Sequence, residues 1–277
     1  MANLRAIRMR IKSVESTRQI TKSMKMVAAA KLRKTQKAFG NLRDFAGKSE
    51  AILCSVAAAA PKGDENPYRQ EHPENKRVCY VLIVGNRGLC GTYNHSLLRV
   101  WEQLREEEVR ETSLITVGRW GRDLIGKTDG HFEVSDTPTA EEARNLTEAL
   151  KELYRCGKAD EIVLIYQQFR SVLQQNPTLR TLLPLALPEG SEAGDWIFEP
   201  DADTVLDRLT ELYLENTVFA ALLEARTGEH AARMTAMTAA ADNTEERIRE
   251  LTLELNHARQ AAITTEISEI VGGAAAL

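Results

Sequence analysis

Both ends of the chain place apolar residues at the spacing of an α-helix. Near the start these positions follow one another at intervals of three or four residues, and the same spacing returns near the end. Positions three and four apart share one face of a helix, so each end presents an apolar stripe. The two stripes consist of Leu4, Ile7, Ile11 and Val14, and of Ile248, Leu251, Leu255, Ala258 and Ala262.

The prolines indicate how far these helices extend. All eight lie between Pro61 and Pro200, and proline in a helix interior costs about 3 kcal/mol. We therefore predict one helix over 1–60 and another over 201–277, each on the order of 100 Å long. Helices of that length are best stabilised as an antiparallel coiled coil, in which each buries its stripe on the other. The glycines at which they could break are Gly40, Gly47 and Gly228.

The segment between the two helices alternates strand and helix patterns. A polar linker over 61–76 leads into it, and we predict a foot domain over 77–200. Strands alternating with helices indicate a parallel sheet, so we expect an α+β fold: the coiled coil plus a central Rossmann-like α/β domain. The expected strands cover 78–84, 113–117 and 161–166, a turn and strand follow 127, and the expected helices cover 96–110, 120–125 and 139–155.

Composition and charge narrow the class of protein. A hydrophobic content of 43% and a charged content of 27% fit a soluble globular chain, and no run of about 18 apolar residues predicts a membrane span. Positive charge is concentrated in residues 1–37, which hold 11 Lys or Arg and the single acid Glu15. The four cysteines form no C-x-x-C pair and the histidines have no metal-ligand spacing, so we expect reduced thiols and no metal site.

Several patterns leave other functions open. The stretch GRDLIGKT, from Gly121 to Thr128, fits the phosphate-loop pattern G-x-x-x-x-G-K-[ST], which would indicate a nucleotide-binding enzyme. A helix expected within the motif, however, argues that the match is accidental. Glycines at 85, 88 and 91 have a spacing that indicates a dinucleotide site only weakly. The basic arm lacks the aromatic residues that favour nucleic-acid binding, and periodicity alone is also compatible with a generic coiled-coil scaffold.

Five stretches of the chain have a distinctive sequence: 7–34, NRGLCGTYN (86–94), QNPTLRTLLPL (175–185), 233–251 and 258–277. Together they resemble the gamma subunit of F-type ATP synthases of the bacterial type. The resemblance covers essentially the whole chain. Some positions depart from that family, since Gly85-Asn86 stands where members usually have Ser-Asp or Thr-Asp, and Thr92 replaces a common glycine.

The resemblance implies a non-catalytic rotor subunit. Its coiled coil would be the central stalk inside a ring of alternating alpha and beta subunits, and its foot would contact the epsilon subunit and the membrane-embedded c ring. Such a subunit transmits torque and so couples ion transport, including hydrogen ion transport, to ATP synthesis or hydrolysis. It would lie at the cytoplasmic face of the bacterial plasma membrane as a peripheral protein, with no cofactor, direct nucleotide binding or nucleic-acid partner.

The resemblance also implies which side chains meet these partners. The alpha/beta ring contacts carried over by motif position are Met24, Lys25, Arg259, Gln260, Thr264 and Glu266. The contacts carried over for the c ring and epsilon are Arg87, Phe198 and Glu199. By helical periodicity alone Met24 and Met26 are equally compatible with a role as core filler. Past Arg259 the charged side chains are only Glu266 and Glu269. A tail with so little charge suits an apolar surface that surrounds the end of the helix.

Overall fold

The chain divides into two compact units in the computed structural model. Residues 1–28 and 234–277 form one, here called the terminal unit, and residues 29–233 form the other, here called the sheet unit. Helix α1 (Ala2–Ala59) and helix α5 (Ala202–Ala275) contribute to both. The structure describes residues 2–59, 66–70, 72, 75–125, 128–186, 194 and 196–275.

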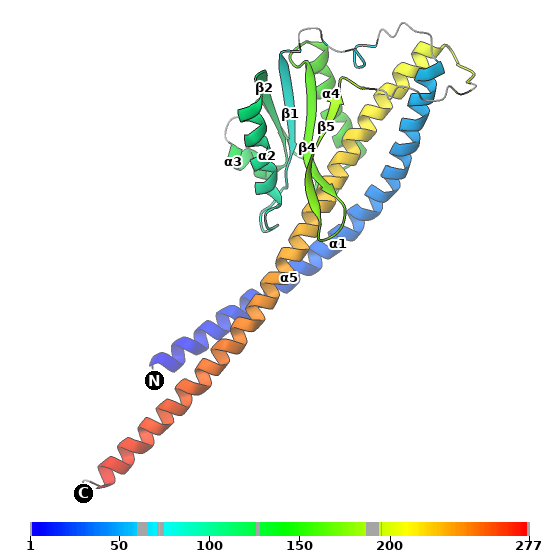
Figure 1. The fold of residues 1–277 in the computed structure, drawn as a ribbon. Helices are drawn as coiled ribbons and strands as arrows, with labels where there is room; N and C mark the ends of the chain where they lie inside the picture. The colour runs from blue at the N-terminus through cyan, green and yellow to red at the C-terminus, as the bar shows by residue number, and fades with distance from the viewer. Residues whose placement is uncertain are drawn as a thin grey trace. The chain divides into compact units, whose positions relative to one another are not determined.

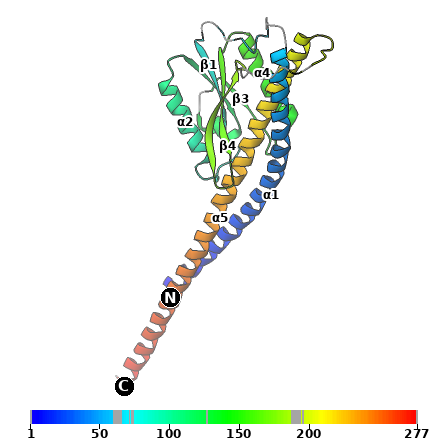
Figure 2. The ribbon, with the colours of Figure 1, turned by 45° about the vertical axis from the view of Figure 1, so that its right-hand side comes forward.

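Both terminal helices are unbroken, and they lie side by side and antiparallel, which confirms the predicted coiled coil (Figures 1 and 2). The candidate breaks at Gly40, Gly47 and Gly228 do not occur, since all three residues are helical. A glycine costs a helix only about 1 kcal/mol relative to alanine, which packing along a long stripe readily offsets. None of the described helices combines the length and the apolar composition that crossing a membrane requires.

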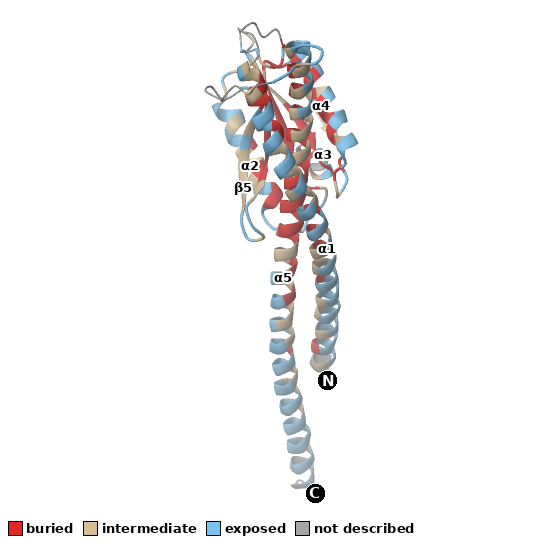
Figure 3. Ribbon diagram, turned by 90° about the vertical axis from the view of Figure 1, so that its right-hand side faces the viewer, coloured by how far each residue is buried: buried red, intermediate tan, exposed pale blue. Residues whose placement is uncertain are grey.

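Burial along α1 and α5 follows the coiled-coil repeat. In the terminal unit Ile7, Thr21 and Ala28 are buried at multiples of seven residues, the repeat that keeps a seam on the partner helix. The repeat continues through the part of α1 in the sheet unit. Figure 3 shows the buried residues of α5 giving way to exposed ones toward its C-terminus. The buried positions of α1 in the sheet unit are Leu32, Thr35, Phe39, Ser49, Leu53 and Val56.

The sheet unit contains a five-stranded sheet in the order β3-β2-β1-β4-β5. The first four strands are parallel, as predicted, and β5 runs antiparallel to β4. The predicted parallel core is therefore confirmed, and β5 adds an antiparallel edge strand over which no strand was predicted. Its Pro177 and polar residues suit an edge strand, where a missing N–H leaves no ladder bond broken. The strands are β1 (Arg77–Ile83), β2 (Glu111–Val117), β3 (Gly130–Phe132), β4 (Glu161–Phe169) and β5 (Gln175–Leu183).

Three shorter helices connect the strands. Helix α2 (Tyr93–Glu107) begins and ends three residues before its predicted range, whereas α3 (Arg119–Ile125) and α4 (Ala140–Arg155) match theirs within a residue. The start of α4 is fixed by a capping box, in which Thr139 and Glu142 satisfy each other's backbone N–H groups.

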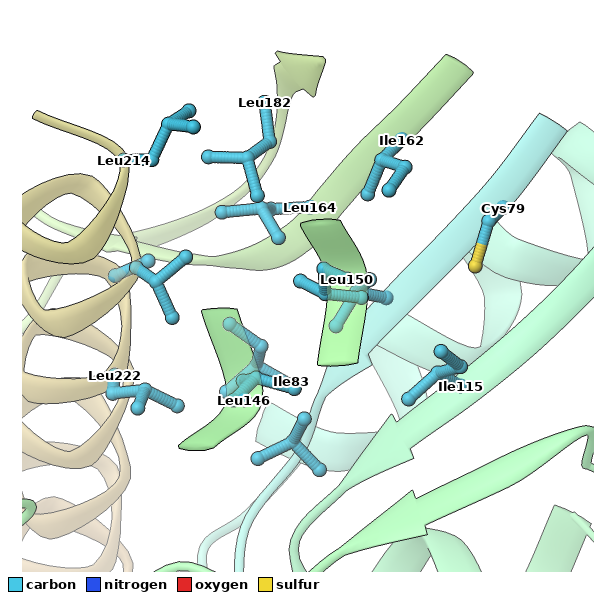
Figure 4. Packing of buried hydrophobic residues seen from close by; sticks show 14 of the residues in the cluster. Cys79, Ile83, Ile115, Leu146, Leu150, Ile162, Leu164, Leu182, Leu214 and Leu222 are labelled. Atoms are coloured by element: carbon cyan, nitrogen blue, oxygen red, sulfur yellow. The ribbon is translucent and has the colours of Figure 1, made fainter. Parts of the chain in front are cut away.

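The central strand β1 is buried on both faces, which explains its continuous apolar sequence. On one face Cys79, Val81 and Ile83 join a cluster with α4 and α5 (Figure 4). On the other face Tyr80 lies between its register partners Leu114 and Val163 and beside α2. Helices α2 and α4 therefore cover opposite faces of the sheet, as in doubly wound α/β folds.

The α4 face of this core should dominate the stability of the sheet unit. Leu150 is fully buried there, so we expect Leu150→Ala to lower the free energy of unfolding by about 2–5 kcal/mol through lost burial and a cavity. Urea unfolding followed by tryptophan fluorescence measures this change. The matched control is Leu253→Ala on α5, where the leucine is 61% exposed. Equal effects of the two substitutions would contradict the core assignment.

Candidate functional site

Helix α5 carries four polar residues into the interior of the sheet unit. Arg226, Glu229, His230 and Arg233 are spaced so that they share one face of the helix, and each is at least 90% buried. Charged side chains are almost never buried this far unless they are paired. This face of α5, here called the joint, therefore needs partners from the sheet.

The joint is built around one carboxylate. Glu229 is 1% exposed and pairs with Arg226 at 2.7 Å and with Arg233 at 2.6 Å, through a different oxygen in each case. Burial acts to raise the pKa of Glu229, but the two guanidinium groups outweigh it and hold the pKa below its ordinary value. The glutamate is therefore ionised and bridges two arginines that lie about one turn before and one turn after it on α5.

The same three side chains hold the loop that follows β1. Arg226 donates to the carbonyl of Val84 at 3.0 Å and to Oδ1 of Asn86 at 2.9 Å. The N–H of Asn86 donates to Glu229 at 3.2 Å, and Arg233 donates to the carbonyl of Arg87 at 3.1 Å. Residues 84–91, here called the β1 loop, are thus fixed to α5 by backbone as well as side-chain atoms.

Two glycines allow the chain to approach this closely. A Cβ on Gly85 would lie 2.9 Å from the carboxyl carbon of Glu229, and one on Gly118 would lie 2.3 Å from the carbonyl oxygen of Val84. Gly118 also has φ +106°, a conformation that other residues rarely adopt. Glu229 therefore occupies the space that a side chain at position 85 would need.

The joint fills the place where doubly wound folds bind ligands. That place lies outside the carboxyl ends of two strands whose connections leave in opposite directions, here β1 and β4. In this chain the N–H of Asn86 in the β1 loop meets the carboxylate of Glu229 instead of an external phosphate. The glycines of this loop therefore serve internal packing, and the dinucleotide interpretation has no support.

The phosphate-loop motif also lies in the wrong structural context. Helix α3 begins at Arg119, so Gly121 is helical and buried, and a Cβ there would lie 3.0 Å from Val84 and 3.1 Å from Thr116. A phosphate loop needs its first glycine in a loop ahead of the helix. Gly126 and Lys127 lie outside the described residues. The described half of the motif is a packing feature, and the nucleotide-binding alternative is not supported.

A second set of contacts connects α1 to the joint. Lys31 pairs with Asp136 at 2.5 Å, and Asn86 donates to the carbonyl of Val134 at 2.7 Å. A ring nitrogen of His230 lies 3.1 Å from the backbone oxygen of Asp136. Burial acts to raise the pKa of Asp136, but its hydrogen bonds to Lys31 and Asn86 bring the pKa down to about 2.

The partner-contact residues expected from the resemblance fall in both units. In the terminal unit Met24 and Lys25 are half-buried on α1, and four exposed residues lie near the end of α5. In the sheet unit Arg87 is exposed in the β1 loop, and Glu199 is exposed. Phe198 packs on the cluster of Leu53, Val56, Leu185 and Leu206. Their contacts with partners remain predictions. The four exposed residues of α5 are Arg259, Gln260, Thr264 and Glu266.

Sequence reasoning missed the joint itself. It assigned no role to Arg226, Glu229 and Arg233, although these residues share a helix face with apolar residues. That coincidence of charge and apolar face was the signal available in the sequence. Within the described ranges, no three His, Cys, Asp or Glu residues gather closely enough to hold a metal ion.

Removing the central charge of the joint should strongly destabilise the sheet unit. In Glu229→Gln two buried guanidinium groups lose their counter-charge, and breaking a buried pair in this way costs about 3–5 kcal/mol. Urea unfolding monitored by tryptophan fluorescence gives the change. The control is Glu245→Gln, which breaks an exposed pair with Arg249 and should cost at most about 1 kcal/mol. A loss no larger than that of the control would refute the role of Glu229.

The Lys31–Asp136 pair should make stability depend on pH in acid. The folded pKa of Asp136 lies below its ordinary value of 3.8, so its contribution is present above that pH and is lost as pH falls toward about 2. We expect Asp136→Asn to be less stable than the original chain at pH 7, with the difference shrinking between these limits. Unfolding titrations at several pH values measure this, with exposed Asp242→Asn as control. A difference that stays constant down to pH 2 would contradict the assignment.

Comparisons with known proteins identify the family. A family model described as ATP synthase matches residues 3–277. The ATP synthase gamma chains of Desulfitobacterium hafniense and Moorella thermoacetica are each 44% identical to this chain, with 100% of both chains covered. A rotor structure of the Euglena gracilis mitochondrial ATP synthase shares the fold, with a TM-score of 0.67 at 17% identity, covering 95% of this chain and 99% of that one. The chain therefore belongs to the ATP synthase gamma-chain family.

Proposed function

We propose that this chain is the non-catalytic central-stalk rotor subunit of an F-type ATP synthase. The observation that carries the proposal is its full-length likeness to ATP synthase gamma chains. In this role 1–60 and 201–277 are the shaft helices, 61–76 is the linker and 77–200 is the foot. The subunit turns with the c ring and drives the alpha and beta subunits through their nucleotide-binding states, and it lies peripherally at the cytoplasmic face of a bacterial plasma membrane.

The joint supports this role because a rotor must not slip internally. Torque that enters through the sheet unit has to reach α5, and α5 runs without a break into the terminal unit. A buried carboxylate held by Arg226 and Arg233, beside a continuous apolar core, resists rotation of α5 against the β1 loop. The interface is stiff because any such rotation would expose uncompensated charge to the protein interior.

The surface of the terminal unit supports a surrounding partner. Several apolar side chains on the two helices are at least 44% exposed there, and exposed apolar patches indicate interaction sites. The tail beyond Arg259 adds little charge, so an apolar sleeve formed by alpha and beta subunits can cover it without fixed ion pairs that oppose turning. The exposed apolar residues are Met9, Ile20, Met26, Val27, Ile263, Ile267, Ile270 and Val271.

The individual partner contacts follow from the same role. We assign Met24 and Lys25 on α1, with four residues of α5, to the alpha/beta ring. We assign Arg87, Phe198 and Glu199 to the c ring and the epsilon subunit. All of these side chains are exposed or half-buried, so a partner can reach them without unfolding the chain. The four residues of α5 are Arg259, Gln260, Thr264 and Glu266.

Reconstitution with alpha and beta subunits tests the rotor role. We expect the purified chain alone to show no ATPase activity, and we expect coupled synthesis to require it in the assembled enzyme. The double variant Ile263→Asp/Ile267→Asp puts charge on the exposed apolar surface and should lower coupled synthesis by at least about tenfold, because each buried charge costs several kcal/mol. Lys127→Ala is the control and should leave turnover unchanged.

Two outcomes would contradict the proposal. An enzyme that lacks this chain and still synthesises ATP at the normal rate would exclude a rotor role. A pull-down from cell extract that recovers no six-membered ring of alpha and beta subunits would favour a generic coiled-coil scaffold instead.

A further inference from the structure

The sheet unit contains a second polar region, on a different face of α5 from the joint. A cavity of about 490 Å³ opens between α1, the end of β4, the middle of β5 and the first half of α5, and this volume is typical of small-ligand sites. Three arginines line it, each from a different element: Arg43 from α1, Arg170 from the turn after β4 and Arg180 from β5.

These arginines interact with the cavity wall without closing ion pairs: Arg180 also contacts Tyr166, and Glu224 attracts both Arg43 and Arg180. Arg170 donates to the side-chain oxygen of Gln168 at 3.3 Å, and Arg180 donates to the hydroxyl of Tyr213 at 3.2 Å. Within the described part of the chain, none of the three forms an ion pair with a carboxylate, whereas Arg226 and Arg233 in the joint both do. A planar guanidinium suits bidentate binding of carboxylate or phosphate oxygens, so three of them around one cavity favour an anion.

The cavity also contains a proton acceptor. Glu224 lines it, is 9% exposed, and accepts the backbone N–H of Phe169 at 3.0 Å. Glu50 lies at the α1 side, 3.4 Å from the hydroxyl of Tyr213. Guanidinium groups still outnumber carboxylates. A lining of donors with a buried carboxylate suits an anion that keeps a proton, because such an anion can accept from arginine and donate to Glu224.

We propose that this cavity binds a phosphate group, either as inorganic hydrogen phosphate or as the terminal phosphate of a nucleotide. Phosphate oxygens accept hydrogen bonds from the arginines, and the remaining P–OH donates to Glu224. Sulfate has the same shape but carries no proton at neutral pH, so Glu224 repels it. The bound phosphate bridges Arg43 of α1 and Arg180 of β5, and it therefore stabilises the sheet unit. This site is independent of the rotor role.

Calorimetric titration of the full chain tests the site, with phosphate, sulfate and ADP compared at one ionic strength. We expect phosphate to bind at least about tenfold more tightly than sulfate. Phosphate donates a hydrogen bond to the buried carboxylate of Glu224, whereas sulfate is repelled by it, and the resulting difference in binding free energy exceeds that of one hydrogen bond. ADP binding more tightly than phosphate would indicate a nucleotide as the source, and ADP binding equally or less tightly would indicate free phosphate. Absence of phosphate binding at millimolar concentration would overturn the proposal.

Variants of exposed residues separate binding from folding. Arg43→Gln/Arg170→Gln changes two exposed side chains and should weaken phosphate binding by at least about tenfold, because two charge-assisted hydrogen bonds are lost. The control is Arg247→Gln in the terminal unit, where the arginine is exposed and pairs with Glu250. Equal phosphate affinity in the double variant and the control would overturn the assignment.

Two further substitutions test the chemistry of the site. Glu224→Gln removes the repelling charge and should bring sulfate affinity up to that of phosphate, and unchanged discrimination would refute the role of Glu224. A Cβ on Gly47 would meet no atom within 4 Å, and glutamate is a better helix former than glycine. Gly47→Glu therefore adds a carboxylate at the cavity with little risk to folding and should abolish phosphate binding. Unaltered binding in this variant would place the anion elsewhere.

Discussion

The ion pairs of Glu229 determine how the rest of the sheet unit is arranged. A carboxylate with 1% exposure is tolerated in a protein interior only when its charge and its lone pairs are satisfied, and here two arginines and the N–H of Asn86 do so. Those contacts fix α5 beside the carboxyl end of β1 and leave no room for a side chain at Gly85. Because the pairing is internal, the crevice that would accept a nucleotide in a related fold is closed from within.

The stability of the two long helices depends on packing along their length rather than on a buried charge. Helices α1 and α5 contain 58 and 74 residues, and the intrinsic stability of an isolated helix is small, so most of their stability comes from packing. Buried positions recur at coiled-coil spacing, which keeps the seam of each helix on the other. Glycines within the helices are tolerated because the repeat on either side holds the backbone in place.

Local patterns in the sequence predicted most of the fold. The absence of proline gave the extent of α1 and α5, and continuous apolar runs gave β1, β2 and β4, because both features depend on neighbouring residues alone. Strand β5 was missed because Pro177 and alternating polar residues resemble a loop until an adjacent strand is known. The joint was missed for a similar reason. Arg226 and Arg233 are close to Glu229 in the sequence, but the β1 loop that the three side chains hold lies more than a hundred residues away. Partner contacts such as that of Met24 were inferred from the resemblance to a family, because they depend on other chains as well as on this one.

Pattern and context also separate the two phosphate-related features of this molecule. The stretch from Gly121 to Thr128 has the letters of a phosphate loop, but Gly121 is packed inside a helix. The arginines at 43, 170 and 180 match no motif, yet the fold gathers them around one cavity. Recognition of an anion requires donors that converge in space and are not already paired. The joint uses its arginines to neutralise Glu229, and the cavity beside α1 leaves its arginines available, so the same side-chain chemistry serves rigidity in one place and binding in the other.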